Sequence, residues 1–199
     1  MLTIACDDRD FTEWHGGARH ILIWAALVDT DEVRAAVESA REHWAGVLLP
    51  RYERQPHITV RYGGPVPREG AVPMDPLYTD ERVAADRATI EALRLSPFDV
   101  RIGGWSTFEM VPYLHAEAPE LGLTAGALGE DLLRPYVPHV TIGHYAVEAP
   151  LAEMSALGAG WSWPEAVVRI ERLSLLRYDA ADIAGPLTVV DEVPLTPGV

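Results

Sequence analysis

The sequence predicts an α+β fold built from two similar halves that face each other across a central cleft. Residues 56–60 and residues 138–142 both read Pro-His-aliphatic-Thr-aliphatic. Each of these pentapeptides lies in a unit with the pattern strand, helix, strand, at residues 21–62 and 111–145. We interpret the repeat as an internal duplication, with two mostly antiparallel sheets related by a pseudo-two-fold axis and with helices on the outside.

The first half reads as a buried strand, a helix and the first motif strand. Residues 21–28 form a near-continuous apolar run, which is typical of a strand buried on both faces. Asp29, followed by Glu32, predicts a capping box at the start of a helix. Apolar residues then recur at helical spacing as far as Trp44. The first motif strand opens after Pro56, because proline is tolerated where a strand begins.

The middle of the chain contains a long irregular segment. Residues 63–78 are rich in Gly and Pro, which excludes regular structure. We expect a plain connection there, with a lid on the substrate side as the alternative. A helix is predicted over residues 79–94, and its first residue is either Thr79 or Asp80. Two strands follow, at residues 98–102 and 111–116, and we expect a loop between them.

The second half repeats the pattern and adds a closing hairpin. A third helix is predicted from apolar residues at helical spacing: Leu121, Ala125, Leu128 and Leu132. The second motif strand is predicted from His139 to Tyr145, and a short helix over residues 151–157. Two aliphatic strands then make a final hairpin within residues 167–195. Residues 1–19 have no strong pattern, and we expect either a strand-like arm or a loose terminus.

Size and composition indicate one folded domain. The chain has 199 residues, of which 48% are hydrophobic, and we expect residues 1–199 to form a single domain of two merged lobes. One cysteine, Cys6, excludes an internal disulfide and a cysteine metal cluster. The longest apolar run, residues 21–28, is too short to cross a membrane. We therefore expect a cytoplasmic protein, with no membrane partner, that is a monomer.

The charge balance bears on the size of the substrate. The net charge is −14, and all 16 basic residues are arginine. A protein that grips long nucleic acid needs a broad basic face, which this chain cannot present. Several arginines lie near the motifs. Together they could form a small positive patch that fits a short anion, although they could equally be scattered and solvated. The arginines near the motifs are Arg51, Arg54, Arg61, Arg68 and Arg134.

The two motifs carry the chemistry. Side chains at i and i+2 of a strand share a face, so His57 lies beside Thr59, and His139 beside Thr141. Two imidazoles can act as a general base and a general acid, since histidine titrates near neutral pH. The hydroxyls can stabilise charge on phosphate oxygens. A single such histidine would more often belong to the core, but the matched pair favours a catalytic site. The seven histidines show no zinc-ligand spacing, so no metal is expected.

This arrangement resembles the 2H phosphoesterase superfamily, also called LigT-like or 2′-5′ RNA ligase-like, which is named for two His-x-Thr motifs. The first motif runs into Arg-Tyr-Gly-Gly at residues 61–64, as in many members. The approach to the second motif, at residues 132–137, and the hairpin at 167–195 are also similar. The resemblance covers residues 17–195. His144 departs from it, because many relatives carry arginine there, and this departure bears on substrate class more than on chemistry.

The resemblance implies a metal-independent phosphodiesterase without a cofactor. It would open 2′,3′-cyclic phosphate ends of RNA or nucleotides to 2′-phosphates, with 2′-5′ RNA ligase activity in the reverse direction. The residues alone do not decide which histidine is the base, and the resemblance favours His139 as base and His57 as acid. Two alternatives stay open. One is an enzyme for another small cyclic or 2′-5′-linked nucleotide, and the other is a non-catalytic nucleotide sensor.

Five further residues are candidates for substrate binding. Arg61 and His144 follow their motif histidines by four and five positions, so they could contact phosphate from the strand ends. Exposed charges at the ends of strands are the alternative. Trp105, Phe108 and Tyr113 lie in or beside the predicted loop, where they could stack on a nucleobase. For these three the alternative is packing in the core.

Overall fold

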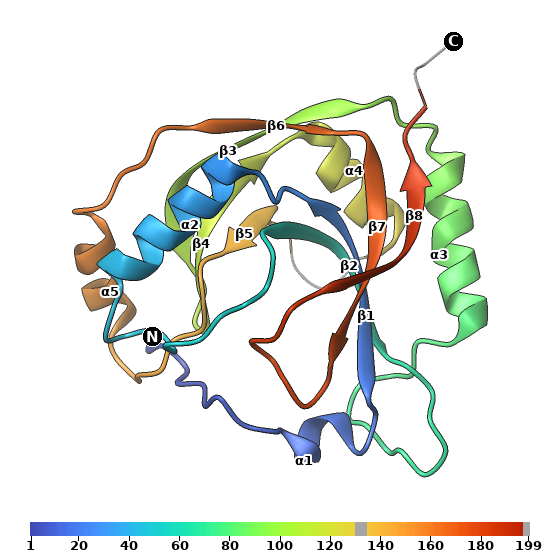
Figure 1. Cartoon of the computed structure of the whole chain (residues 1–199), viewed down its shortest axis with the longest axis horizontal. Coiled ribbons are helices and arrows are strands. Elements are labelled where there is room, and N and C mark those ends of the chain that lie inside the picture. The colour runs from blue at the N-terminus through green and yellow to red at the C-terminus, as the bar shows by residue number, and fades with distance from the viewer. Residues whose placement is uncertain (130–134, 197–199) are drawn as a thin grey trace.

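The computed structural model describes residues 1–129 and 135–196, and it has helices on the outside of two sheets (Figure 1). The strands are β1 (His20–Leu27), β2 (His57–Pro65), β3 (Phe98–Thr107), β4 (Pro112–Glu117), β5 (His139–Thr141), β6 (Ala166–Ile170), β7 (Arg172–Asp179) and β8 (Thr188–Pro194). The helices are α1 (Thr12–His15), α2 (Asp31–His43), α3 (Asp80–Ala92), α4 (Pro119–Ala127) and α5 (Leu151–Gly158). Among these helices, none has the length and apolar character of a membrane span.

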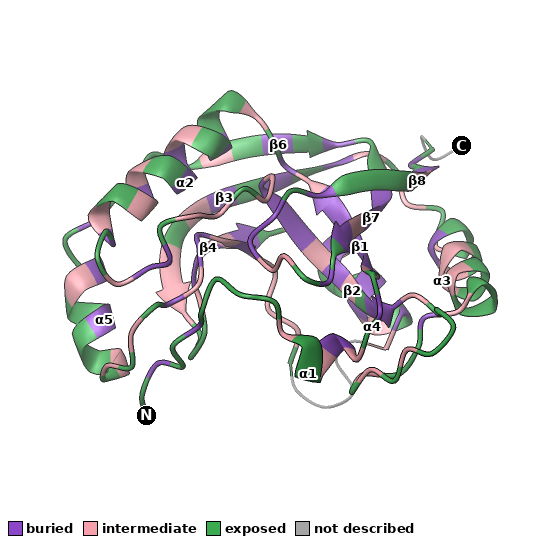
Figure 2. Cartoon of the chain, turned by 60° about the horizontal axis from the view of Figure 1, so that its bottom comes forward, coloured by how far each residue is buried: buried purple, intermediate pink, exposed green. Residues whose placement is uncertain are grey.

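The predicted α+β class with two antiparallel sheets is confirmed. Within the described residues, the strand orders are β2-β1-β7-β8 and β5-β4-β3-β6. Each motif strand is therefore the edge strand of its sheet, and it pairs antiparallel with the strand that opens its own unit. The units β1-α2-β2 and β4-α4-β5 repeat the same order, as the duplication predicts. β1, β2 and β4 are mostly buried, whereas Figure 2 shows β8 largely exposed and the helices with exposed faces outward.

Several predicted boundaries are wrong. The cap of α2 is Thr30 rather than Asp29, because the Thr30 hydroxyl accepts the Val33 N–H. β5 ends at Thr141, since the chain then leaves β4, and Tyr145 pairs with Leu48 instead. The predicted closing hairpin is present, because β7 and β8 pair antiparallel in the first sheet, but it begins later than predicted, since the first residues of the predicted span belong to β6 in the second sheet.

β3 also extends well beyond its predicted end, to Thr107, so most of the predicted loop is strand. Gly104 has a φ of 62°, which lets it form a bulge through which pairing with β4 continues. The end of the predicted third helix, at Leu132, lies outside the described residues.

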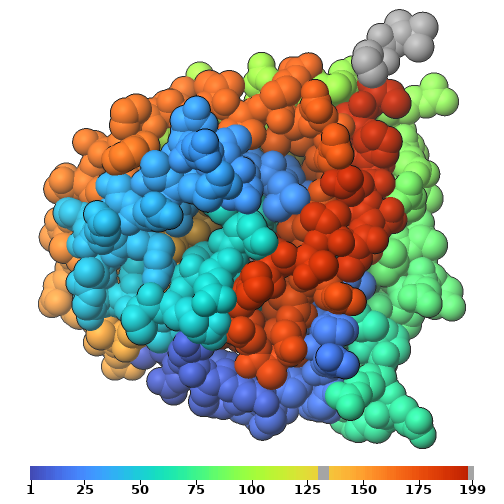
Figure 3. Space-filling model, viewed as in Figure 1, coloured from blue at the N-terminus to red at the C-terminus, as the bar shows by residue number. Residues whose placement is uncertain are grey.

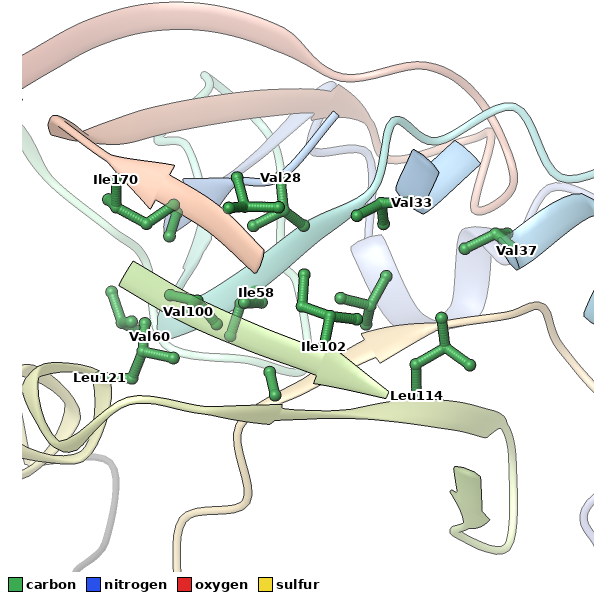
Figure 4. Packing of buried hydrophobic residues seen from close by; sticks show 14 of the residues in the cluster. Val28, Val33, Val37, Ile58, Val60, Val100, Ile102, Leu114, Leu121 and Ile170 are labelled. Carbon is green, nitrogen blue, oxygen red and sulfur yellow. The ribbon is translucent and has the colours of Figure 1, made fainter. Parts of the chain in front are cut away.

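One hydrophobic core joins the two sheets. Ile58 and Val60 of β2, Val140 of β5 and Ile142 just after it are fully buried and belong to one cluster. Figure 4 shows Ile58 and Val60 beside residues of β3 in the second sheet. The helices cross between the units, since α4 contacts β2 and the end of α2 packs on β3. The main core is therefore shared by both halves, and the first lobe also has a smaller cluster of its own, on β1, β7 and the turn that follows β7.

Residues 1–19 form an arm that joins both lobes, which is closer to the predicted strand-like arm than to a loose terminus. On the second-lobe side, the Thr3 N–H donates to the Ala149 carbonyl at 2.8 Å, and the Cys6 N–H donates to the Tyr145 carbonyl at 2.7 Å. On the first-lobe side, the Trp14 carbonyl accepts the Met74 N–H at 2.9 Å. The arm runs along the lower side of Figure 1.

We predict that Gly158→Ala destabilises the protein, whereas Gly122→Ala does not. A Cβ at Gly158, the last residue of α5, would lie 2.0 Å from the Trp105 ring, so the packing of α5 on β3 must shift. Such overpacking costs about 1–3 kcal/mol. A Cβ at Gly122 in α4 meets nothing within 4 Å, and alanine there should stabilise the helix by up to about 1 kcal/mol. Urea unfolding of both variants measures this, and equal midpoints would contradict the packing described here.

Candidate active site

The two motif histidines are held in the same way. Nδ1 of His57 lies 2.8 Å from the Gln55 carbonyl, and Nδ1 of His139 lies 2.7 Å from the Val137 carbonyl. A carbonyl oxygen can only accept a hydrogen bond, so Nδ1 carries the proton in each ring. Among the described residues, neither Nε2 has a hydrogen-bond partner. Nε2 is therefore the nitrogen that each ring offers for proton transfer.

The proline of each motif explains this shared anchor. Gln55 and Val137 each precede a proline, which disfavours helical backbone at that position and favours an extended conformation. The proline itself has a fixed φ and no N–H. The carbonyl two residues before the histidine is therefore presented to the imidazole in both halves. The Pro-His pair is thus a positioning element as well as the start of a strand.

The two edge strands bring the motifs together. β2 and β5 contact each other, and the Tyr136 hydroxyl donates to the Thr59 carbonyl at 2.8 Å. Burial is the main cause of the lowered pKa of His57, and the charge of His139 also lowers it, as expected for imidazoles on contacting strands. Thr59 pairs with Ala25 across the sheet and Thr141 with Tyr113, on the same faces as the histidines. The predicted set of two imidazoles and two hydroxyls is therefore gathered at one place.

Two of the three predicted aromatic residues lie beside His139. The ring centroid of Phe108 is 5.1 Å from that of His139, and the centroid of Tyr113 is 5.2 Å from it. Phe108 and Tyr113 stack on each other at 4.4 Å. Tyr113 is buried, whereas Phe108 is 37% exposed, so Phe108 is the ring that a ligand could reach.

Trp105 is not brought to the site. In β3 the register passes from Gly103 opposite His115 to Trp105 opposite Leu114, so the bulge at Gly104 moves Trp105 to the face of Leu114. That face is the core, where Trp105 packs on Trp44 with ring centroids 5.1 Å apart.

Arg61 has partners on the helical side of the first sheet. Its Nε donates to Asp86 at 3.2 Å, and it also donates to the Leu128 carbonyl at 3.0 Å. A bulge between Thr59 and Arg61 places Arg61 opposite Trp24, on the core face. The predicted contact of Arg61 with phosphate stays a prediction.

Arg54 is a cation at the site, where the sequence predicts it only as part of a local positive patch. Its guanidinium lies 3.9 Å from the ring centroid of Tyr178. Among the described residues it pairs with no carboxylate, and its buried Nε has no hydrogen-bond partner. Arg51, by contrast, binds Asp8 and Asp182, each at 2.6 Å. The feature of the sequence that could have identified Arg54 as a site residue is its position three residues before His57.

Burial keeps the histidines of the site neutral. It lowers the pKa of His57 to about 4, with smaller contributions from the charges of Arg54 and His139. Burial likewise lowers the pKa of His139. His144, whose buried Nδ1 lacks a partner among the described residues, has a pKa lowered to about 4 by burial and then by Arg54 and Arg41. An anion bound among these groups would favour their protonation.

A pocket of about 360 Å³ adjoins this site. From the two lobes it is lined by Arg54, Met110, His144, Tyr178 and Ile183, and its remaining wall comes from the N-terminal arm. Within the described ranges, no three His, Cys, Asp or Glu side chains are grouped so that they could hold a metal ion. His144, which the sequence predicts as a substrate-binding residue, lines this pocket together with Arg54.

Comparisons with known proteins agree with this geometry. The family model described as "2′-5′ RNA ligase superfamily" matches residues 29–182. TT0787 of Thermus thermophilus has a similar structure, with a TM-score of 0.56 and 19% identity over 88% of this chain and 97% of its own. E. coli LigT complexed with 3′-AMP gives 0.59 and 17% identity over 89% and 99%. At these identities the structures show the fold alone. No curated protein sequence matches.

We predict that Arg54→Gln raises the pKa of both His57 and His144, because it removes a positive charge that disfavours their protonation. Arg51→Gln is the matched control, since the Arg51 charge is already paired with Asp8 and Asp182. NMR titration of the imidazole carbons measures each pKa. Unchanged titrations in Arg54→Gln would show that its guanidinium does not act on the site.

Proposed function

Because the chain belongs to the 2′-5′ RNA ligase superfamily, we propose that it is a metal-independent phosphodiesterase that opens 2′,3′-cyclic phosphates of nucleotides or RNA ends to 2′-phosphates. One observation carries the proposal. Two imidazoles, each with Nδ1 bound to a carbonyl and Nε2 left available, lie on adjoining edge strands. Two proton-transfer groups in one site suit a reaction that needs a base and an acid at once.

The reaction proceeds by attack of water on phosphorus. One imidazole takes a proton from the water at Nε2 while the water oxygen bonds to phosphorus. The bond from phosphorus to the ribose 3′ oxygen breaks, and the second imidazole gives its proton to that oxygen. The product is a 2′-phosphate with a free 3′ hydroxyl. When a 5′ ribose hydroxyl replaces water as the nucleophile, the same ring opening joins two nucleotides by a 2′-5′ linkage and frees the 3′ hydroxyl, which is the ligase activity.

The remaining groups of the site stabilise charge. The hydroxyls of Thr59 and Thr141 donate hydrogen bonds to the non-bridging phosphate oxygens as negative charge gathers there. Arg54 supplies a positive charge that no described carboxylate neutralises. His144 adds a buried ring nitrogen without a partner in the described part of the chain. These groups bind phosphate before the reaction and hold it more strongly during the reaction.

The active form of the pair carries one proton. The resemblance assigns the base to His139 and the acid to His57. In the free site Arg54 acts on His57 and opposes that assignment, because its charge favours a neutral His57. A phosphate between the rings reduces this opposition by attracting a proton to either one. The two pKa values that govern turnover belong to the pair rather than to one residue.

We predict that His57→Ala and His139→Ala each lower kcat by roughly 10²-fold or more with little change in affinity, because an imidazole transfers its proton only in the transition state. The double variant should be scarcely slower than the weaker single variant, since the two rings act as a unit. His43→Gln is the control, as that ring bonds to Leu157 on the outer helices. A panel of 2′,3′-cyclic nucleotides, 2′-5′ oligonucleotides and cyclic dinucleotides, analysed by product mass, supplies the substrate.

The same panel separates the alternatives. Turnover of only a cyclic dinucleotide or a 2′-5′ linkage would replace the proposed substrate class. If every panel member binds but none is turned over, the cleft is a nucleotide sensor, and the proposed function is wrong.

We predict a bell-shaped dependence of kcat/KM on pH with its optimum below pH 6.5. The base must be neutral and the acid protonated, and both free-enzyme pKa values lie below that of ordinary histidine. Bound phosphate raises these pKa values, so the optimum of kcat should lie at higher pH than that of kcat/KM.

We also predict that activity survives EDTA. Complete loss with chelator, restored by Zn²⁺ or Mn²⁺, would indicate a metal-dependent mechanism instead.

A further inference from the structure

The N-terminal arm, residues 1–19, lies outside the region that the family model matches, which begins at residue 29. It nevertheless supplies one wall of the pocket that Arg54 and His144 line, through Cys6, Phe11 and Trp14. Figure 3 shows the arm along the lower side of the molecule, next to the segment at residues 50–56 and the turn between β7 and β8.

Side chains as well as backbone hold the arm over this pocket. The Thr3 hydroxyl donates to the Val147 carbonyl at 2.6 Å and accepts the Ala149 N–H at 2.9 Å. At the other end, the Trp14 indole donates to Asp75 at 2.9 Å. Because the arm is fixed at both ends, the wall that it forms is part of the folded site.

The pocket is lined by both aromatic and basic side chains. Phe11 and Trp14 are half-buried and supply aromatic surface from the arm. The Arg9 guanidinium lies 4.0 Å from the ring centroid of Phe11 and covers one face of that ring. From the two lobes, Arg54 and His144 each contribute a buried nitrogen without a hydrogen-bond partner in the described residues. A flat ring joined to a phosphate matches this combination.

The charge of the arm limits how much phosphate can enter. Asp7, Asp8, Asp10 and Glu13 are exposed on it, and the whole chain has a net charge of −14. Two of them are partly neutralised, Asp8 by Arg51 and Glu13 by Arg9, but the arm remains acidic. One phosphate can bind beside Arg54, whereas a chain of further phosphates would meet negative charge along the arm.

We propose that the N-terminal arm is the base-binding wall of the site, with the nucleobase against Phe11, and that the substrate is accordingly a nucleoside 2′,3′-cyclic phosphate rather than the end of an RNA chain. This inference rests on the proposed function and narrows it. It gives the arm a role in specificity, separate from the proton transfers of the motif histidines.

Three substrates test it: a nucleoside 2′,3′-cyclic phosphate, 1-O-methylribose 2,3-cyclic phosphate, which has no base, and a trinucleotide with the same cyclic end. The wild-type protein should have the highest kcat/KM for the nucleoside. Phe11→Ala should raise KM for the nucleoside about tenfold with kcat unchanged, since the loss of base stacking on one aromatic ring weakens binding by about that factor. It should leave KM for the baseless substrate unchanged. The preference over the trinucleotide should shrink as salt is raised.

Ile4→Ala is the control, because Ile4 lies on the same arm, is 49% exposed and does not line the pocket. Phe11→Leu, which keeps apolar bulk, guards against a folding defect and should raise KM for the nucleoside less than Phe11→Ala does. Equal effects of Phe11→Ala on the nucleoside and the baseless substrate would overturn the base-binding wall. Equal or better wild-type turnover of the trinucleotide would overturn the restriction to single nucleotides.

A binding measurement separates this inference from the proposed function. Calorimetry with a nucleoside 2′-phosphate and with ribose 2-phosphate needs no turnover. If none of the three substrates is hydrolysed but Phe11→Ala still weakens only the nucleoside ligand, the wall stands and the phosphodiesterase proposal fails. If the substrates are hydrolysed and Phe11→Ala weakens the binding of neither ligand, the proposed function stands and the arm does not bind the base.

Discussion

The shared core beneath the two motif strands fixes the orientation of these strands, and with it the direction in which the motif histidines and threonines point. Ile58, Val60, Val140 and Ile142 are fully buried in one cluster that both sheets contribute to. Burying each such side chain stabilises a protein by about 1.5–3 kcal/mol, so a register slip that exposed all four would cost about as much as the total stability of a typical domain. The strands therefore have one orientation, and it places each motif histidine and threonine on the opposite face.

The proline before each histidine completes the positioning. It holds the preceding residue extended, and the carbonyl of that residue accepts a hydrogen bond from Nδ1–H of the imidazole. Each ring is thereby fixed in the tautomer that offers Nε2. Burial and Arg54 together favour the neutral form of His57. The site is consequently prepared for an anion, which reverses this preference by its own charge when it binds.

The sequence was sufficient where side-chain alternation continued without interruption. The faces of His57, Thr59, His139 and Thr141 follow from the strand period alone. The positions of Arg61 and Trp105 did not follow, because a β-bulge precedes each residue and moves it to the core face. A bulge depends on pairing with the neighbouring strand, which one sequence does not show.

The irregular segments were the other limit. Arg54 lies between α2 and β2, and Phe11 in the N-terminal arm, where no periodicity indicates which way a side chain points. Their positions depend on contacts with distant parts of the chain, such as those of Thr3 with Val147 and of Arg51 with Asp182. The candidate site therefore combines a pair of histidines that the local pattern predicts with a pocket that only the tertiary structure assembles.

The most direct test of this account is a crystal structure of the protein with a nucleoside and vanadate, which together mimic the five-coordinate phosphorus of the reaction. We expect the vanadium between the two motif histidines, with Nε2 of His57 and Nε2 of His139 each about 2.6–3.2 Å from an opposite apical oxygen. Both Nδ1 atoms should remain on the Gln55 and Val137 carbonyls. Vanadate bound away from either histidine, or contacted through Nδ1, would contradict the two-histidine mechanism.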